Sequence, residues 1–157
     1  MAILAGLGSY QAAQLDAPDH NDALTGVPNR RAWDLELARH LANARRSGEP
    51  VVVALLDLDH FKRFNDQYGQ FGVCVTGLAP AAVAQVLDRV QAATPLGQTF
   101  SAGVAAWTGE EAPERLVARA DEALHRATRA GRGRVMVHDG QTVAAPAQGL
   151  VATAETG

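Results

Sequence analysis

The stretch LLDLDHFKRFNDQYGQFGVCVTG, residues 55–77, decides how this sequence is interpreted. It continues an apolar, β-branched run, VVVALLDLD (51–59), which is typical of a strand buried on both faces whose carboxyl end reaches solvent. Asp57 and Asp59 stand at that end, where hard oxygen ligands could hold Mg²⁺ against a substrate phosphate. About a dozen residues later the stretch becomes a plain apolar strand, FGVCVTG (71–77).

The two acids have alternative interpretations. Residues i and i+2 of a strand share a face, but a loop that begins at Leu58 lets only one carboxylate reach a metal ion. Surface acids that merely end a strand remain an alternative. A calcium loop is excluded, because Lys62 stands where that loop needs glycine and Tyr68 where it needs a bidentate glutamate.

Helix and strand patterns alternate on both sides of this stretch. Apolar residues at helical spacing predict helices within 27–50, 80–94 and 113–131, each bounded by a capping residue, proline or glycine. Short β-branched runs predict further strands at 99–107 and 134–140. The alternation predicts an α/β layered sandwich with one central sheet.

Length and composition describe one ordinary globular domain. The chain has 157 residues, 47% of them hydrophobic and 20% charged, with a formal charge of −3. This balance gives no reason to expect nucleic acid as a partner, and no segment approaches the ~18 apolar residues of a membrane span. The single cysteine, Cys74, lies in an apolar run and excludes an internal disulfide, which fits a reducing cytoplasm.

Composition also divides the chain. Residues 1–20 are rich in Ala and Gly and are expected to be an N-terminal lead-in outside the core. Residues 21–140 carry all the periodic segments and are predicted to be the folded domain. Residues 141–157 have no periodicity and little charge, so they are predicted to form a flexible tail.

Several separated segments resemble one family in the same order, the GGDEF domain of diguanylate cyclases. They are DALTGVPNRR (22–31), LLDLDHFKRFND (55–66), FSAGVA (100–105) and ADEALHRATRAGRGRV (120–135), together with the helix before FSAGVA. The resemblance implies a nucleotidyl-cyclase-like palm, with a mainly antiparallel central sheet flanked by helices. In that family two GTP-loaded domains meet face to face, and each 3′-hydroxyl attacks the other's α-phosphate to give cyclic di-GMP, with two Mg²⁺ ions per site.

The resemblance assigns roles to individual residues. Asp57 resembles the metal carboxylate, with the Leu58 carbonyl as a second metal ligand. Four further residues are expected to bind the nucleotide. Phe61 and Lys62 are similar to the pair that holds the terminal phosphates, Asn65 to the residue that hydrogen-bonds the guanine edge, and Arg132 to the arginine on the γ-phosphate. Backbone N–H donors and positively charged side chains suit the binding of phosphate.

The chain departs from the family between Asp66 and Phe71, where only QYGQ stands. The family has a helix, a strand and a hairpin with the sequence Arg-x-Gly-Gly-Asp/Glu-Glu-Phe in that place. The glycine pair, the second metal carboxylate and the arginine of the product-inhibition site are therefore missing. Thr128 also replaces a phosphate-binding lysine. Loss of a helix and a strand would expose apolar surface unless a terminus or a second subunit covers it.

These departures predict a catalytically degenerate GGDEF domain that acts as a binding module in cyclic di-GMP signalling. It would be a homodimer that binds GTP weakly, with Mg²⁺ binding weak or lost. The sequence leaves open an active diguanylate cyclase that uses Asp66 as second metal ligand, and a remnant without function. It does not decide whether the chain is an enzyme.

Overall fold

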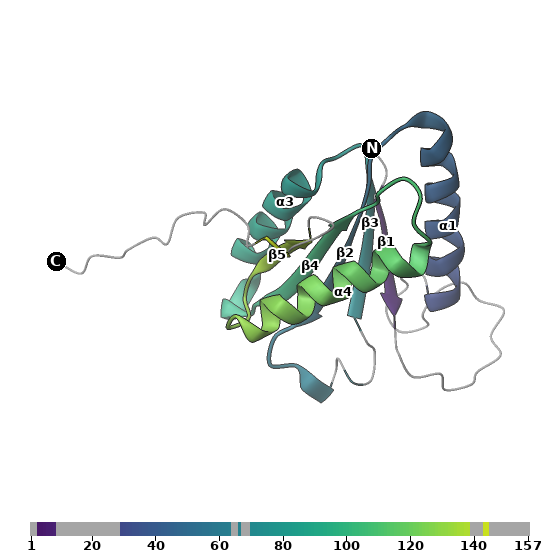
Figure 1. Ribbon diagram of the computed structural model, residues 1–157. Coiled ribbons are helices and arrows are strands. Elements are labelled where there is room, and N and C mark those ends of the chain that lie inside the picture. Colours follow the sequence, from purple (N-terminus) through teal and green to yellow (C-terminus); the bar gives the residue numbers. More distant parts are fainter. Residues whose placement is uncertain (1–2, 9–28, 64–65, 67–69, 139–142, 145–157) are drawn as a thin grey trace.

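The computed structural model describes residues 3–8, 29–63, 66, 70–138 and 143–144. Its described strands form one sheet with the order β1-β3-β2-β4-β5-β6, flanked by helices (Figure 1). All neighbouring strands are antiparallel except β4 and β5. The elements are β1 (Ile3–Gly8), α1 (Arg30–Ser47), β2 (Val51–Leu58), β3 (Gln70–Thr76), α3 (Pro80–Ala92), the 3-10 turn η1 (Pro95–Gly97), β4 (Phe100–Ala106), α4 (Pro113–Arg129), β5 (Val135–His138) and β6 (Val143–Ala144). The predicted α/β sandwich with a mainly antiparallel sheet is confirmed.

The helices begin and end where the local sequence predicts. The Asn29 side chain accepts a hydrogen bond from the backbone N–H of Ala32 (3.0 Å) and so caps the start of α1. Gly48 ends this helix in the left-handed conformation (φ 73°), which glycine adopts without strain. Pro80 and Pro113 occupy the first positions of α3 and α4, where the missing N–H has no helical partner to lose.

Two apolar cores lie on opposite faces of the sheet. On one face α1 and α4 pack over β2, with Trp33, Leu37 and Leu124 buried among Val51, Val53, Leu55, Cys74 and Leu116. On the other face α3 packs on β4 and β5 through Val83 and Leu87. The central strand β2 is therefore buried on both faces, which explains its continuous apolar sequence.

Helix α4 lies unusually close to β4 because of Gly103. A Cβ atom at Gly103 would stand 2.0 Å from the backbone oxygen of Ala120 and 2.2 Å from the backbone nitrogen of Leu124. A side chain of any size would therefore have to push the helix backbone away from the sheet. This contact sets the distance between α4 and β4, the strand that pairs with β2.

On the face of the sheet that carries α3, the helix makes its main contacts with β4 and β5. The strands β2 and β3 are buried on this face in the same apolar cluster as α3. Leu56 and Val73 are only partly buried there. On α3 the side chains of Val86 and Val90 are 39% and 50% exposed. Helix α3 thus keeps a small exposed apolar surface.

The N-terminal region expected to be a lead-in contributes a strand. β1 pairs antiparallel with β3, with Leu4 opposite Cys74 and Leu7 opposite Phe71. Without it β3 would be an edge strand with a row of unpaired backbone N–H and C=O groups, so this pairing removes an unfavourable edge. β6 likewise lies in the expected tail and pairs with β5. The other residues of both terminal segments lie outside the described part of the chain.

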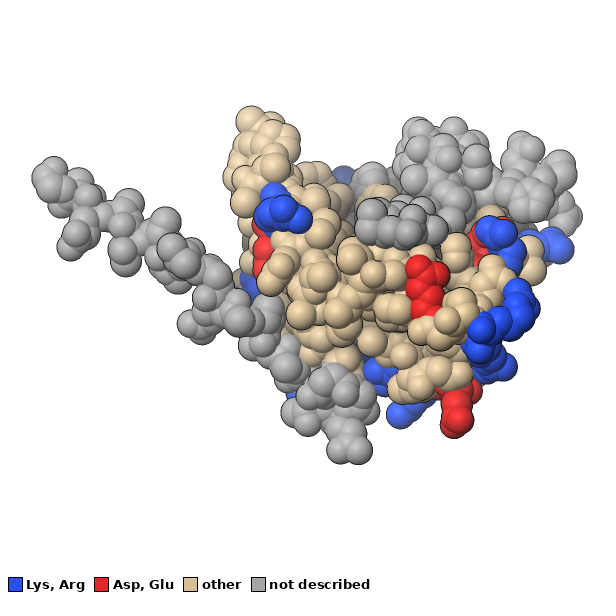
Figure 2. Space-filling model, turned by 90° about the horizontal axis from the view of Figure 1, so that it is seen from above, with Lys and Arg blue, Asp and Glu red and all other residues tan. Residues whose placement is uncertain are grey.

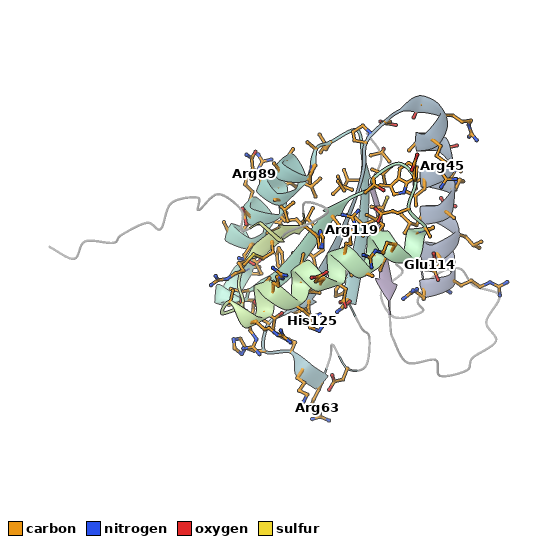
Figure 3. All side chains as sticks on the ribbon, viewed as in Figure 1. Arg45, Arg63, Arg89, Glu114, Arg119 and His125 are labelled. Carbon is orange, nitrogen blue, oxygen red and sulfur yellow. The ribbon has the colours of Figure 1, made fainter. Side chains whose placement is uncertain are left out.

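A buried ion pair closes the end of the sheet where β4 leads into α4. The guanidinium of Arg119 pairs with the Glu111 carboxylate and also donates to the backbone oxygen of Ala106. The indole Nε1 of Trp107 donates to the Glu111 backbone oxygen (3.0 Å), and the Arg45 guanidinium lies 5.6 Å from the Trp107 ring centroid. Figure 3 shows Arg45 at the upper right, beside α1, and Arg119 nearer the middle of the molecule, on α4.

The exposed side of α1 is charged. Arg30 pairs with Asp34 (2.9 Å) and Arg39 with Glu36 (2.6 Å). In Figure 2 basic side chains gather at the right, the side on which α1 lies in Figure 1. Among the described residues, no helix combines the length and the apolar character that crossing a membrane requires.

Candidate functional site

Asp57 lies near the carboxyl end of β2, opposite Ser101 of β4. Side chains alternate along a strand, so Asp57 is on the same face as Leu55, the face covered by α1 and α4. Its Oδ1 is buried and has no hydrogen-bond partner among the described residues. A buried carboxylate oxygen without a donor needs an explanation, and an external cation or donor supplies one.

The electrostatic surroundings of Asp57 are mixed. Burial raises the pKa of Asp57, and the nearby carboxylates of Asp59 and Asp66 raise it further. His125 and Arg132 act in the opposite direction, so both lie within electrostatic range of this carboxylate. The charged form of Asp57 is therefore disfavoured in the protein alone and would be favoured by a bound cation.

The second acid of the sequence pair, Asp59, is a structural anchor. Its Oδ1 accepts from Ser101 Oγ (2.7 Å), and its Oδ2 accepts from Thr99 Oγ1 (2.7 Å) and from the backbone N–H of Gly133 (2.8 Å). The side chain is buried. Asp59 thus ties the start of β4 and the turn after α4 to the end of β2, and Asp57 is left as the acid for a ligand.

On β3, the strand that pairs with β2, the residue opposite Asp57 has a side-chain amide. Leu56 pairs with Phe71, and continuing this register by one residue places Gln70 opposite Asp57. Gln70 Nε2 donates to Asp121 Oδ1 on α4 (3.1 Å). The side chain that faces Asp57 across the strands is therefore neutral.

Sequence reasoning missed this network around Asp121. The other carboxylate oxygen of Asp121 lies 3.5 Å from Nδ1 of His125, one turn further along α4. The i, i+4 spacing of the two residues on a predicted helix was the available signal. Nothing in the sequence showed that Gln70 would meet them from β3.

The predicted nucleotide-binding residues lie around the same end of the sheet. Phe61 and Lys62 come directly after the turn that ends β2, and both are exposed, Phe61 by 42%. Arg132 follows α4 in a left-handed conformation (φ 65°), and its neighbour Gly133 binds Asp59. Asn65 lies outside the described residues. The structure thus brings Asp57 and Arg132 together at one end of the sheet.

The described residues fit one Mg²⁺ ion better than two. Asp57 offers an unpartnered carboxylate oxygen, and the Leu58 backbone follows it in the strand. Mg²⁺ commonly takes one or two carboxylates and keeps several waters, so one ion fits. No group of three or more His, Cys, Asp or Glu side chains that could hold a metal occurs in the described part of the chain. A two-ion arrangement would need a second carboxylate, and Asp66 is the described one near Asp57 besides Asp59.

A separate pocket of about 280 Å³ lies between α1 and α4. Its described lining includes Trp33, Leu55, Gln70 and Asp121. None of the predicted nucleotide or metal residues lines it. Gln70 and Asp121 line this pocket, whereas Asp57 does not, so the pocket lies beside the Asp57 region.

These features define a palm-type α/β domain in which Asp57, near the end of a central strand, has a buried carboxylate oxygen without a hydrogen-bond partner among the described residues. The family described as "Diguanylate cyclase, GGDEF domain" matches residues 19–72. The chain belongs to the GGDEF domain family. Diguanylate cyclases of this family depend on Mg²⁺ and bind GTP and cyclic di-GMP.

The chain is similar to larger signalling proteins. It is 35% identical to diguanylate cyclase DgcP of Pseudomonas aeruginosa and 28% identical to response regulator PleD of Caulobacter vibrioides, over 74% and 73% of its own length. It spans only 23% and 35% of the length of those proteins. The crystal structure of the GGDEF domain of DgcB from Caulobacter crescentus, in complex with c-di-GMP, has a TM-score of 0.69 at 26% identity. That match covers 82% of this chain and 99% of the DgcB chain.

The alignments also measure what this chain lacks. The alignment with DgcP has 157 positions but includes 74% of this 157-residue chain, which is about 116 residues, so about 41 positions of DgcP have no counterpart here. The 159 positions aligned with PleD include about 115 residues of this chain and leave about 44 without a counterpart. Both comparisons are consistent with a shortened domain.

Proposed function

We propose that this chain is a catalytically degenerate GGDEF domain that binds guanine nucleotide weakly and acts as a binding module in cyclic di-GMP signalling. The observation that carries the proposal is the pairing of β2 directly with β3 across a connection of eleven residues, 59–69. This connection leaves Asp57 with the amide of Gln70 opposite it. The aligned positions that are missing here support the same conclusion.

An active diguanylate cyclase is the second candidate, and one observation favours it. Asp66 lies close enough to Asp57 to raise the pKa of that carboxyl, so it could approach a shared cation. Against it, Asp66 is exposed and belongs to no described cluster of metal-binding side chains. Two Mg²⁺ ions on a triphosphate need paired carboxylates for charge and geometry. We therefore favour the binding module.

The first test is nucleotide binding to the intact chain. We expect calorimetry with GTP to show weak binding, and Lys62→Ala and Arg132→Ala each to weaken it about tenfold, because each removes a charge-assisted hydrogen bond to phosphate. Arg39→Ala is the matched control, since Arg39 is an exposed arginine on α1 paired with Glu36. Identical heats for wild type, Lys62→Ala and Arg132→Ala would remove the nucleotide site from the proposal.

We also propose that the chain forms a homodimer through the exposed apolar side of α3. An antiparallel contact of two α3 helices about a two-fold axis places Val86 of one copy against Val90 of the other, so the exposed apolar stripe complements itself. Two exposed valines make a patch well below the ~800 Å² per partner of a standard interface, so the dimer should be weak.

Oligomeric state tests this interface. Light scattering after gel filtration should show dimer that dissociates on dilution in the micromolar range. Val86→Asp together with Val90→Asp should give monomer at all concentrations, because two buried charges would face each other. Leu35→Asp is the control, since Leu35 is 58% exposed on α1, away from this face. A dimer that survives the double substitution would place the contact elsewhere.

We place this module in the cytoplasm. Its cysteine, Cys74, is buried in β3, and burial raises the pKa of the thiol to about 12. A single buried cysteine cannot form a disulfide within the chain, and this fits a reducing compartment.

A further inference from the structure

The pocket between α1 and α4 has the size and the walls of a site for one small planar ring. Its volume of about 280 Å³ lies at the lower end of the range of ligand pockets, so it has room for a base but not for a whole nucleotide. Trp33, Leu37 and Val117 supply apolar walls. The Trp33 indole lies against Gly72 of β3, where an added Cβ atom would stand 3.0 Å from the ring. Figure 3 shows Glu114, another lining residue, at the start of α4 beside α1.

The floor of this pocket belongs to the same face of the sheet as Asp57. Leu55 of β2 and Gly72 of β3 are opposite each other in the register, and both line the pocket. Asp57 and Gln70 form the next pair on this face, two residues further along the strands, which is about 7 Å. A ring over the first pair would therefore extend its substituents toward the second pair. There Asp57 has a buried carboxylate oxygen without a partner among the described residues.

The pocket also contains a hydrogen-bond acceptor, the Asp121 carboxylate. Gln70 Nε2 donates to Asp121 Oδ1 (3.1 Å), which holds this side chain in the wall of the pocket. Asp121 Oδ2 lies 3.5 Å from His125 Nδ1, which is longer than an ordinary hydrogen bond. Each carboxylate oxygen has two positions for a donor, so Asp121 can accept from a ligand while it keeps Gln70.

We propose that this pocket binds the guanine base of the nucleotide, with the Asp121 carboxylate accepting from guanine N1–H and the 2-amino group. The inference rests on the guanine-nucleotide binding proposed above and names a base site for it. None of the described lining residues is among those that the family resemblance assigns to the nucleotide. Guanine presents adjacent N–H donors to a carboxylate, whereas adenine presents a ring nitrogen, which is a second acceptor. The ribose and phosphates then lie outside the pocket, toward Asp57.

The test compares GTP with inosine triphosphate, which lacks the 2-amino group, by calorimetry on the intact chain. Wild type should bind GTP about tenfold more tightly, the worth of one hydrogen bond to a charged group. In Asp121→Asn the side-chain oxygen can keep Gln70, but an NH₂ group then faces the base, so the preference should disappear. Glu36→Gln should retain it and is the control, because Glu36 is an α1 carboxylate outside the described lining of the pocket.

A second variant fills the pocket without changing its polar group. Ala118 lines the pocket and is exposed on α4, so Ala118→Phe should fold normally and place its ring at the mouth. It should weaken GTP and inosine triphosphate alike, by about tenfold or more, because the added ring takes the space of the base. Ala81→Phe is the matched control, since Ala81 is an exposed alanine of α3, outside the described lining.

The outcomes separate this base site from nucleotide binding itself. Equal affinity of wild type for GTP and inosine triphosphate, or a preference that Asp121→Asn retains, would overturn the base site and leave nucleotide binding intact. GTP binding unchanged in Ala118→Phe would do the same. Folded wild-type protein, verified by circular dichroism, that binds neither nucleotide would overturn the guanine-nucleotide function and this inference together.

Discussion

Purified protein incubated with GTP and Mg²⁺ is expected to release no detectable cyclic di-GMP. Each charge-stabilising group removed from a preorganised site commonly costs ~10²–10³ in rate. The second carboxylate and the glycine hairpin are both missing, so the rate should fall by about 10⁴ or more relative to an active relative. The measurement is chromatographic detection of product after long incubation at high protein concentration.

DgcP, assayed in parallel, serves as the positive control, since it is described as a diguanylate cyclase. Asp57→Asn should change nothing measurable if the wild type is inactive. Robust product formation that disappears in both Asp57→Asn and Asp66→Asn would establish the alternative enzyme with Asp66 as second ligand. Product that survives both substitutions would indicate contamination by another cyclase.

The second large effect is structural, and it concerns Gly103. Gly103→Ala should destabilise the protein by about 3 kcal/mol or more, because the added methyl group meets backbone atoms of α4 that cannot move alone. Natural domains are stable by only ~5–15 kcal/mol, so part of the population could unfold at 37 °C. Urea denaturation monitored by circular dichroism measures the difference in the free energy of unfolding.

Gly109→Ala is the matched control for that experiment. Gly109 has a positive φ of 98°, but a methyl group added there would meet no atom within 4 Å, so the cost is backbone strain of about 1 kcal/mol. A Gly103→Ala loss no larger than that of Gly109→Ala would mean that α4 can lift from β4. The predicted nucleotide site would then depend on a mobile helix, because Arg132 directly follows α4.

Much of the fold followed from local patterns in the sequence. The run VVVALLDLD (51–59) predicted a strand buried on both faces, and β2 lies between two cores. Pro80, Pro113 and Gly48 marked helix ends because their backbone chemistry acts on nearest neighbours. The segments that resemble the GGDEF family predicted the mainly antiparallel sheet, which the described strands confirm.

The terminal strands could not be predicted in the same way. β1 has the sequence ILAGLG (3–8), which has no strand alternation and contains two glycines. It forms a strand because β3 offers an open edge, and that edge exists only once the sheet is assembled. The same holds for the exposure of Val86 on α3, which depends on how the helix packs on the sheet.

The sequence by itself determined the family and the central strand with its two acids, and it predicted the loss of the second carboxylate, because these depend on residue type and order along the chain. Only the tertiary structure decided that Asp59 is an anchor while Asp57 keeps an unpartnered oxygen, and that Gln70, Asp121 and His125 form one network. The physical reason is that hydrogen bonding and burial depend on neighbours far apart in sequence. Asp59 meets Gly133 across 74 positions, a contact that no local pattern contains.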